Sequence, residues 1–94
     1  MKPGDVYFVK SQYKLLLFSS PDKIDDYASL VGTIKNDAPC MILEATRGKA
    51  GGWKDVSAIR VASAGGLSGW SYQHRLENFL DLASKNERRT KKKP

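Results

Sequence analysis

A glycine-rich turn that leads into a tryptophan, in residues 65–72, constrains the fold of this chain more than any other stretch. Gly65 and Gly66 suit a tight turn, because glycine tolerates the positive φ that such turns require. Gly69 allows two backbones to approach closely, and Trp70 brings the largest apolar side chain to that point. The stretch therefore predicts a corner of a small β barrel, with Trp70 in its core.

The residues before this turn have the pattern of a strand. Ile59 and Val61 lie on one face and Arg60 on the other, because side chains alternate along a strand. Residues 57–62 and the glycine turn therefore predict a β-hairpin, in which Trp70 begins the second strand.

Four further strands are predicted upstream, each a short apolar or β-branched run bounded by turn residues. They cover residues 6–10, 13–18, 31–35 and 40–45. Between the second and third strands, the spacing of Ile24, Tyr27 and Ala28 suits either a long loop or one helical turn. Residues 46–52 contain three glycines and are expected to form a flexible loop that ends at Trp53.

Residues 73–84 predict one helix. Leu76, Phe79, Leu80 and Ala83 recur at helical spacing and so share one face. The expected fold class is therefore mainly β: a small barrel of five or six short antiparallel strands with a C-terminal helix.

Length and composition set limits on the class of protein. The 94 residues allow one domain with a modest core. Cys40 is the only cysteine, so an intrachain disulfide is impossible. No apolar run approaches the roughly 18 residues of a membrane span, and the first residues lack the apolar stretch of a signal peptide. We therefore expect a cytoplasmic protein.

The net charge of +6 is concentrated at one end of the chain. Residues 1–84 carry ten basic and nine acidic side chains, whereas residues 85–94 carry six basic and one acidic. We expect residues 1–84 to form the folded domain and residues 85–94 to be a disordered tail. The tail either aids solubility or attracts nucleic acid or another polyanion through Arg88, Arg89, Lys91, Lys92 and Lys93. The nearly neutral remainder argues against a broad nucleic-acid-binding face.

A series of short motifs follows the chain in order. They are Leu17-Phe18-Ser19-Ser20-Pro21, Val31-Gly32-Thr33-Ile34-Lys35-Asn36-Asp37, Cys40-Met41-Ile42-Leu43-Glu44, Gly51-Gly52-Trp53, Ile59-Arg60-Val61, Gly69-Trp70 and Arg75-Leu76. Their order and spacing resemble the bacterial Src-homology-3 (SH3) domain over residues 6–80. The chain departs from that family in residues 54–58, which look inserted, at Ser71, where an apolar residue is usual, and in the longer C-terminal helix.

The resemblance implies an SH3-like barrel and a binding module rather than an enzyme. Members of the family bind cell-wall peptide bridges, other peptides or partner proteins, in a groove between the long first loop and the loop that ends in tryptophan. Carried onto this chain, that groove implies a ligand surface made of Tyr7, Tyr13, Asp22, Asp25, Asp26, Tyr27, Trp53 and Tyr72.

Physical chemistry supports part of this surface. Aromatic rings offer flat apolar area at a small entropy cost, and loop carboxylates can pair with a basic residue of a ligand. Trp53 is the residue expected to expose its ring, and the alternative is a place in the core. For Asp25 and Asp26 the alternative is a solvated loop.

Catalytic and metal-binding patterns find little support in the sequence. His74, the only histidine, lies on the polar side of the predicted helix, and Cys40 lies in a predicted core strand. Asp22, Asp25 and Asp26 have too few partners for a metal site. Residues 48–52 lack the lysine placement and the following helix of a phosphate-binding loop.

These observations predict a non-catalytic intracellular protein-binding module, an adaptor or an inhibitor, which docks through an aromatic groove and uses no cofactor. A small free-standing module of this kind suits a bacterial phage or mobile-element protein. Two alternatives stay open: a small nucleic-acid-binding protein that uses the basic tail, and a binder of cell-wall peptides.

Overall fold

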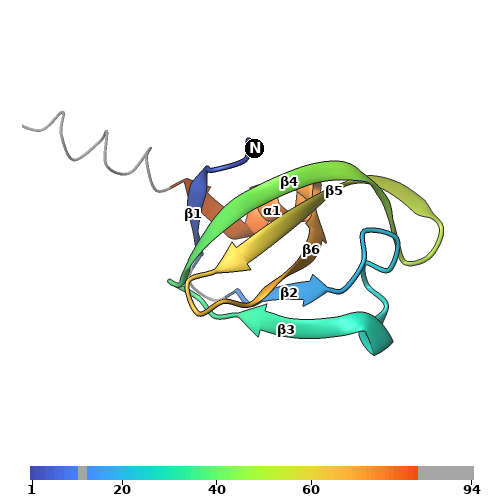
Figure 1. Cartoon of the computed structure of the whole chain (residues 1–94), viewed down its shortest axis with the longest axis horizontal. Helices are drawn as coiled ribbons and strands as arrows, with labels where there is room; N and C mark the ends of the chain where they lie inside the picture. Colours follow the sequence, from blue (N-terminus) through green and yellow to red (C-terminus); the bar gives the residue numbers. More distant parts are fainter. Residues whose placement is uncertain (11–12, 83–94) are drawn as a thin grey trace, which may run out of the picture.

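The computed structural model describes residues 1–10 and 13–82. The elements are β1 (Val6–Val9), β2 (Leu15–Phe18), a 3-10 turn η1 (Tyr27–Ser29), β3 (Leu30–Ile34), β4 (Pro39–Ala50), β5 (Lys54–Ser63), β6 (Ser68–Tyr72), α1 (Gln73–Phe79) and β7 (Leu80–Leu82). The mainly β fold with a short helix near the C-terminal end is confirmed (Figure 1). The predicted tail, residues 85–94, lies outside the described residues.

The strands form one antiparallel sheet in the order β3-β2-β6-β5-β4-β1-β7. Within the described residues, no pairing joins the two edge strands β3 and β7, so closure into an SH3-like barrel stays a prediction. The β4–β5 hairpin dominates the sheet, with strands of 12 and 10 residues. It arches along one side of the molecule, and its tip projects beyond the other strands (Figure 1).

Two groups of buried apolar side chains lie on opposite faces of the hairpin. The larger is made of Val9, Leu15, Leu17, Ile34, Cys40, Ile42, Ile59, Val61, Leu76 and Leu80. The smaller is made of Phe18, Ile24, Ala50 and Ala58. Ala58 falls in the smaller group and its neighbour Ile59 in the larger, because adjacent residues of a strand point to opposite faces. The fold is therefore stabilised by apolar burial on both faces of β5.

The corner predicted around Gly69 is only partly as expected. The close approach is confirmed, since a Cβ added at Gly69 would lie 2.8 Å from Leu17 Cβ and 2.8 Å from Val31 Cγ2. Trp70, however, is half-buried against the smaller apolar group and does not lie in the main core. The side chain at the next position, Ser71, is the fully buried one, because it points to the opposite face of β6.

The predicted helix is shorter than residues 73–84. Helix α1 ends at Phe79, and Leu80 begins β7, which pairs with β1 through Val9 and Leu80. The reason is tertiary: the edge of β1 offers backbone partners that the helical spacing of the leucines does not reveal. Leu76 is buried as predicted, whereas Ala83 lies outside the described residues.

The predicted loop over residues 46–52 is instead a continuation of β4. The strand extends to Ala50 and pairs with β5 from Lys54 onward, so that only residues 51–53 form the turn. Residues 54–58, which looked like an insertion, are the matching extension of β5. No helix in the described residues is long and apolar enough to cross a membrane.

Candidate ligand-binding surface

The loop between β2 and β3 crosses the β4–β5 hairpin and holds its outer part in place. The N–H of Lys49 donates to the carbonyl oxygen of Pro21 at 2.9 Å, and Ile24 forms a bridge with Ala50. Gly48 permits this crossing, because a Cβ there would overlap the carbonyl oxygen of Pro21. The long hairpin is therefore supported close to its tip.

Trp53 stands at the tip of the hairpin and exposes 78% of its surface. Gly51 and Gly52 precede it with φ of 66° and 83°, a conformation that glycine adopts without strain. The exposed ring predicted from the sequence is confirmed. An exposed tryptophan is the kind of side chain that anchors protein interfaces.

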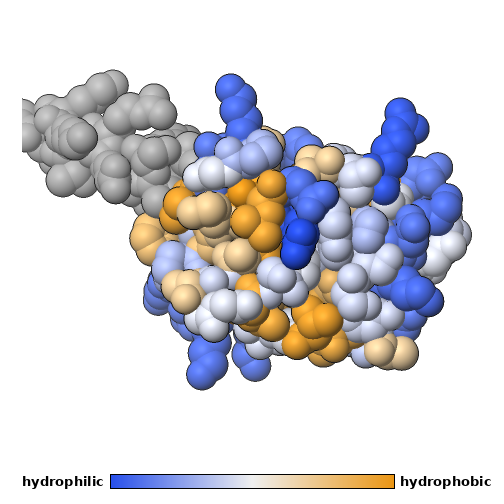
Figure 2. All heavy atoms as spheres, in the orientation of Figure 1, coloured by the Kyte–Doolittle hydropathy of each residue, from blue (hydrophilic) through white to orange (hydrophobic). Residues whose placement is uncertain are grey.

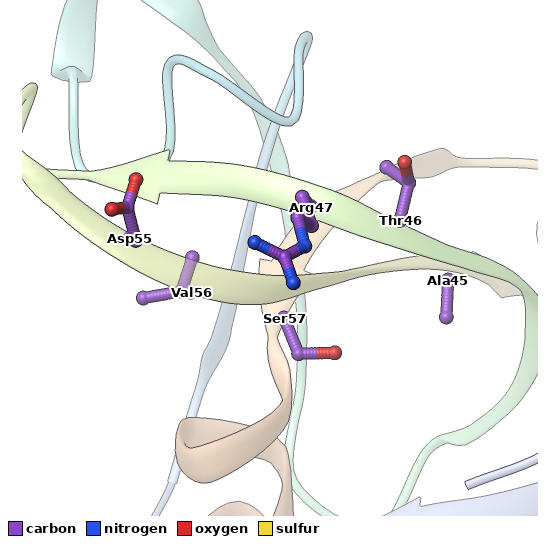
Figure 3. A pocket seen from close by; sticks show the side chains of 6 residues that line it. All are labelled: Ala45, Thr46, Arg47, Asp55, Val56 and Ser57. Carbon is purple, nitrogen blue, oxygen red and sulfur yellow. The ribbon is translucent and has the colours of Figure 1, made fainter.

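A hollow of about 740 Å³ lies along the outer half of the hairpin. It is lined by Ala45, Thr46, Arg47, Asp55, Val56 and Ser57 (Figure 3). Figure 3 shows the guanidinium group of Arg47 reaching from β4 across β5, between Asp55 and Ser57. We call this feature the hairpin hollow. It presents a cation and a hydroxyl group on an open surface.

Within the described residues, some of the charged side chains around the hairpin hollow form ion pairs with neighbouring residues, and one does not. Lys49 Nζ lies 2.7 Å from Asp55 Oδ1, and this hydrogen bond raises the pKa of Lys49 and lowers the pKa of Asp55. On the opposite face of the hairpin, Arg60 donates to Glu44 at 3.1 Å. Arg47 makes no ion pair with any described residue. It is therefore the cation of the hollow that can meet an external anion.

A second hollow, of about 300 Å³, adjoins the first along β5. It shares Asp55, Val56 and Ser57 with the hairpin hollow, and its other wall is Tyr72 and the first turns of α1. It forms because β6 ends at Tyr72 and the chain turns into the helix, while β5 continues outward. The two hollows together make a continuous open surface beside the hairpin.

Two of the predicted ligand residues, Asp25 and Tyr72, meet at Arg75, and Tyr72 also lines the second hollow. Asp25 accepts two hydrogen bonds from Arg75, at 2.6 and 3.1 Å, and the Arg75 guanidinium lies 4.7 Å from the centre of the Tyr72 ring. Burial disfavours the charged form of Arg75 and so tends to lower the pKa of its guanidinium group. The hydrogen bonds to Asp25 and the negative charge of Asp25 outweigh this effect, and the pKa of Arg75 is raised. Asp25 thus joins the loop to α1, and Asp26 caps η1 by accepting from the N–H of Ala28 at 3.1 Å.

Two other predicted residues of the same loop are exposed. Asp22 lies near Lys49 and contributes to raising the pKa of that lysine. Tyr27 exposes 69% of its surface and contacts Phe18 edge to face, with ring centres 6.1 Å apart. These residues, with Trp53, belong to the hairpin end of the molecule.

Tyr7 and Tyr13 lie elsewhere. Tyr7 pairs with Cys40 at the start of β4, while Trp53 follows the end of that 12-residue strand. Tyr13 stacks on Phe79 with ring centres 4.5 Å apart. The structure therefore divides the predicted aromatic surface into two groups at opposite ends of β4. The polyanion-binding residues predicted in the tail lie outside the described residues.

Cys40 has the properties of a core residue. It is buried, and burial raises its pKa to about 11, which leaves the thiol protonated at neutral pH. His74 is exposed on α1 and lines the second hollow. Among the described residues, no group of three or more histidine, cysteine or carboxylate side chains could hold a metal ion.

An apolar hollow of about 210 Å³ lies at the other end of β4. Its lining includes Val6, Met41 and Ala62, and Met41 exposes 42% of its surface. Figure 2 shows apolar residues over β1 and the neighbouring part of β4, whereas the hairpin end is mostly hydrophilic. The two ends of the hairpin thus differ in character.

The hairpin hollow was missed by the sequence prediction. The sequence predicts a flexible loop at Arg47 and an apparent insertion at Asp55, and it places Ser57 both in that insertion and at the start of the strand 57–62. A signal was present, because residues 46–50 alternate small and basic side chains with the period of a strand. The glycine at position 48 indicated flexibility instead, although its role is to admit the crossing loop.

No family model, curated protein sequence or solved structure matches this chain.

Proposed function

We propose that this chain is a non-catalytic intracellular module, an adaptor or an inhibitor, which docks onto a protein partner through the outer half of its β4–β5 hairpin. The observation that carries the proposal is the ring of Trp53, 78% exposed at the tip of the longest hairpin. Burial of such a ring against a partner releases water from a large apolar surface.

Two further observations support the proposal. The two hollows beside the hairpin give a partner an open surface that extends from Lys54, the residue after Trp53, to the first turns of α1. The hairpin is also held in shape by the crossing loop and by the Asp25–Arg75 pair, so that little order has to be gained on binding. The bacterial SH3 domain, which this sequence resembles, is also a binding module.

Affinity capture from a bacterial lysate tests the proposal. The bait is compared with its Trp53→Ala variant and with Met41→Ser, which changes an exposed apolar residue at the other end of β4. We expect proteins retained by the wild type to be retained by Met41→Ser and lost with Trp53→Ala, because interface energy concentrates in buried aromatic anchors. Equal retention by Trp53→Ala would reject the hairpin tip as the docking point.

A further inference from the structure

The outer edge of β4 has an unpaired stretch in its middle. Before this stretch, the N–H of Ile42 donates to Asp5 at 2.9 Å, and after it the N–H of Lys49 donates to Pro21 at 2.9 Å. Because alternate residues of a strand direct their backbone groups to the same side, Ala45 and Arg47 direct theirs outward, like Lys49. No described strand lies beside these N–H and C=O groups.

This stretch is also open to solvent. The four consecutive residues from Glu44 to Arg47 are all exposed, although they lie in the centre of a 12-residue strand. Proteins usually cover or interrupt such an edge, because its free backbone groups are a template for another strand. We call the stretch 45–47, between the chain segments 4–5 and 21–24, the edge slot.

The flanking segments decide what kind of chain fits the edge slot. Residues 4–5 and 21–24 already occupy the positions beside Ile42 and Lys49. The β4 strand of a second copy would need those positions, because it is continuous over 12 residues. A short extended segment of about three to five residues, which bends away at both ends, fits between them.

The side chains around the edge slot decide the charge of that segment. A residue paired with Arg47 would point to the same face of the sheet, within about 5 Å of it. Arg47 has no ion pair with a described residue, whereas Glu44 and Asp55 are each engaged by a basic partner. The Arg47 guanidinium group lies over β5 (Figure 3), so a change of side-chain rotamer is needed to bring it to the outer edge of β4. There, an aspartate or glutamate opposite Arg47 would form a charge-assisted pair with this planar group.

We propose that the edge slot binds a short extended peptide segment of the partner, which adds as a strand to β4 and places an acidic side chain opposite Arg47. This inference rests on the proposed function, because it names the part of a protein partner that the module recognises. Backbone hydrogen bonds to Ala45 and Arg47 supply affinity, and the acidic side chain supplies specificity.

The test uses a displayed library of random twelve-residue peptides, selected on the full chain, from which one enriched peptide is synthesised. Binding of this peptide is measured by titration calorimetry to the wild type and to Ala45→Pro, Ala45→Val and Arg47→Glu. Ala45→Pro removes an N–H that points away from β5 and so leaves the hairpin ladder intact. Ala45→Val is its matched control, because it keeps the N–H.

We expect Ala45→Pro and Arg47→Glu each to weaken binding by at least about tenfold, and Ala45→Val to bind like the wild type. A peptide with lysine in place of its acidic residue should recover binding to Arg47→Glu. Slower amide exchange at Ala45 and Arg47 in the wild type on peptide addition checks the same contact without any substitution.

Several results would refute the proposal that a peptide binds at the edge slot. They are a library with no enriched peptide, equal binding by Ala45→Pro and Ala45→Val, or unchanged amide exchange at both positions. Sedimentation that shows a dimer abolished by Ala45→Pro would assign the edge to a second copy instead. If partner capture from the lysate depends on Trp53 but not on Ala45→Pro, the proposed function stands and the edge slot fails.

Discussion

Replacement of Gly48 by alanine is expected to detach the crossing loop from the hairpin. The added Cβ would overlap the carbonyl oxygen of Pro21 and lie 2.9 Å from Ala58 Cβ, so the loop must shift. Overpacking of this kind costs about 1–3 kcal/mol, and loss of the Lys49–Pro21 hydrogen bond adds about 1 kcal/mol. The free energy of unfolding should therefore fall by roughly 2–4 kcal/mol, a large part of the total for a small domain.

Urea denaturation followed by circular dichroism measures this change. With a slope of about 1 kcal/mol per molar urea, typical of small domains, the midpoint should fall by roughly 2 M or more. Gly65→Ala is the matched control, because its added Cβ would meet only Ser63 Oγ, at 3.8 Å, and its cost should stay within about 0.5 kcal/mol. If both variants unfold at the wild-type midpoint, the loop does not press on the hairpin as described.

Three further predictions follow from the structure. Trp70→Ala should lower the free energy of unfolding by about 2–3 kcal/mol, less than the loss of a fully buried tryptophan would, whereas Trp53→Ala should lower it by less than about 0.5 kcal/mol. Denaturant curves that show a larger loss for Trp53→Ala than for Trp70→Ala would contradict the burial of the two side chains. A double-mutant cycle with Asp25→Asn and Arg75→Gln should give a coupling of about 1–2 kcal/mol, and additive effects would show that the two hydrogen bonds add no stability. Deletion of residues 85–94 should leave the melting temperature nearly unchanged and remove most of any salt-dependent binding to nucleic acid. Equal binding by the shortened chain would assign such binding to residues 1–84.

The sequence predicted the strands best where apolar and polar side chains alternate. Ile59 and Val61 were assigned to one face on that pattern, and both lie in the larger core. The outer hairpin was not predicted, because small residues such as Gly48 are typical of loops when the segment that packs on them is unknown. The end of α1 was not predictable either, since Leu80 suits the buried face of a helix and of β7 equally well.

The prediction of the candidate surface is incomplete for a similar reason. The exposure of Trp53 follows from local features, namely two glycines and a turn. The partners of the other residues depend on contacts between distant parts of the chain, such as that of Asp25 with Arg75, 50 positions away. The same limit applies to the position of Arg47 in the hairpin hollow, because its surroundings depend on how far the hairpin extends.

The pairing of β1 with β7 has a consequence for biosynthesis. β1 is the first strand of the described residues to be synthesised, but its outer neighbour β7 is available only when Leu80–Leu82 has been made. The β4–β5 hairpin, which lies between β1 and β7 in the sequence, can pair as soon as β5 exists. A chain that stops before Leu80 would expose the backbone groups of β1 on that side and lose one buried leucine of the larger core. A truncated chain released at this point would therefore have a nearly complete sheet whose free edge can pair with another chain.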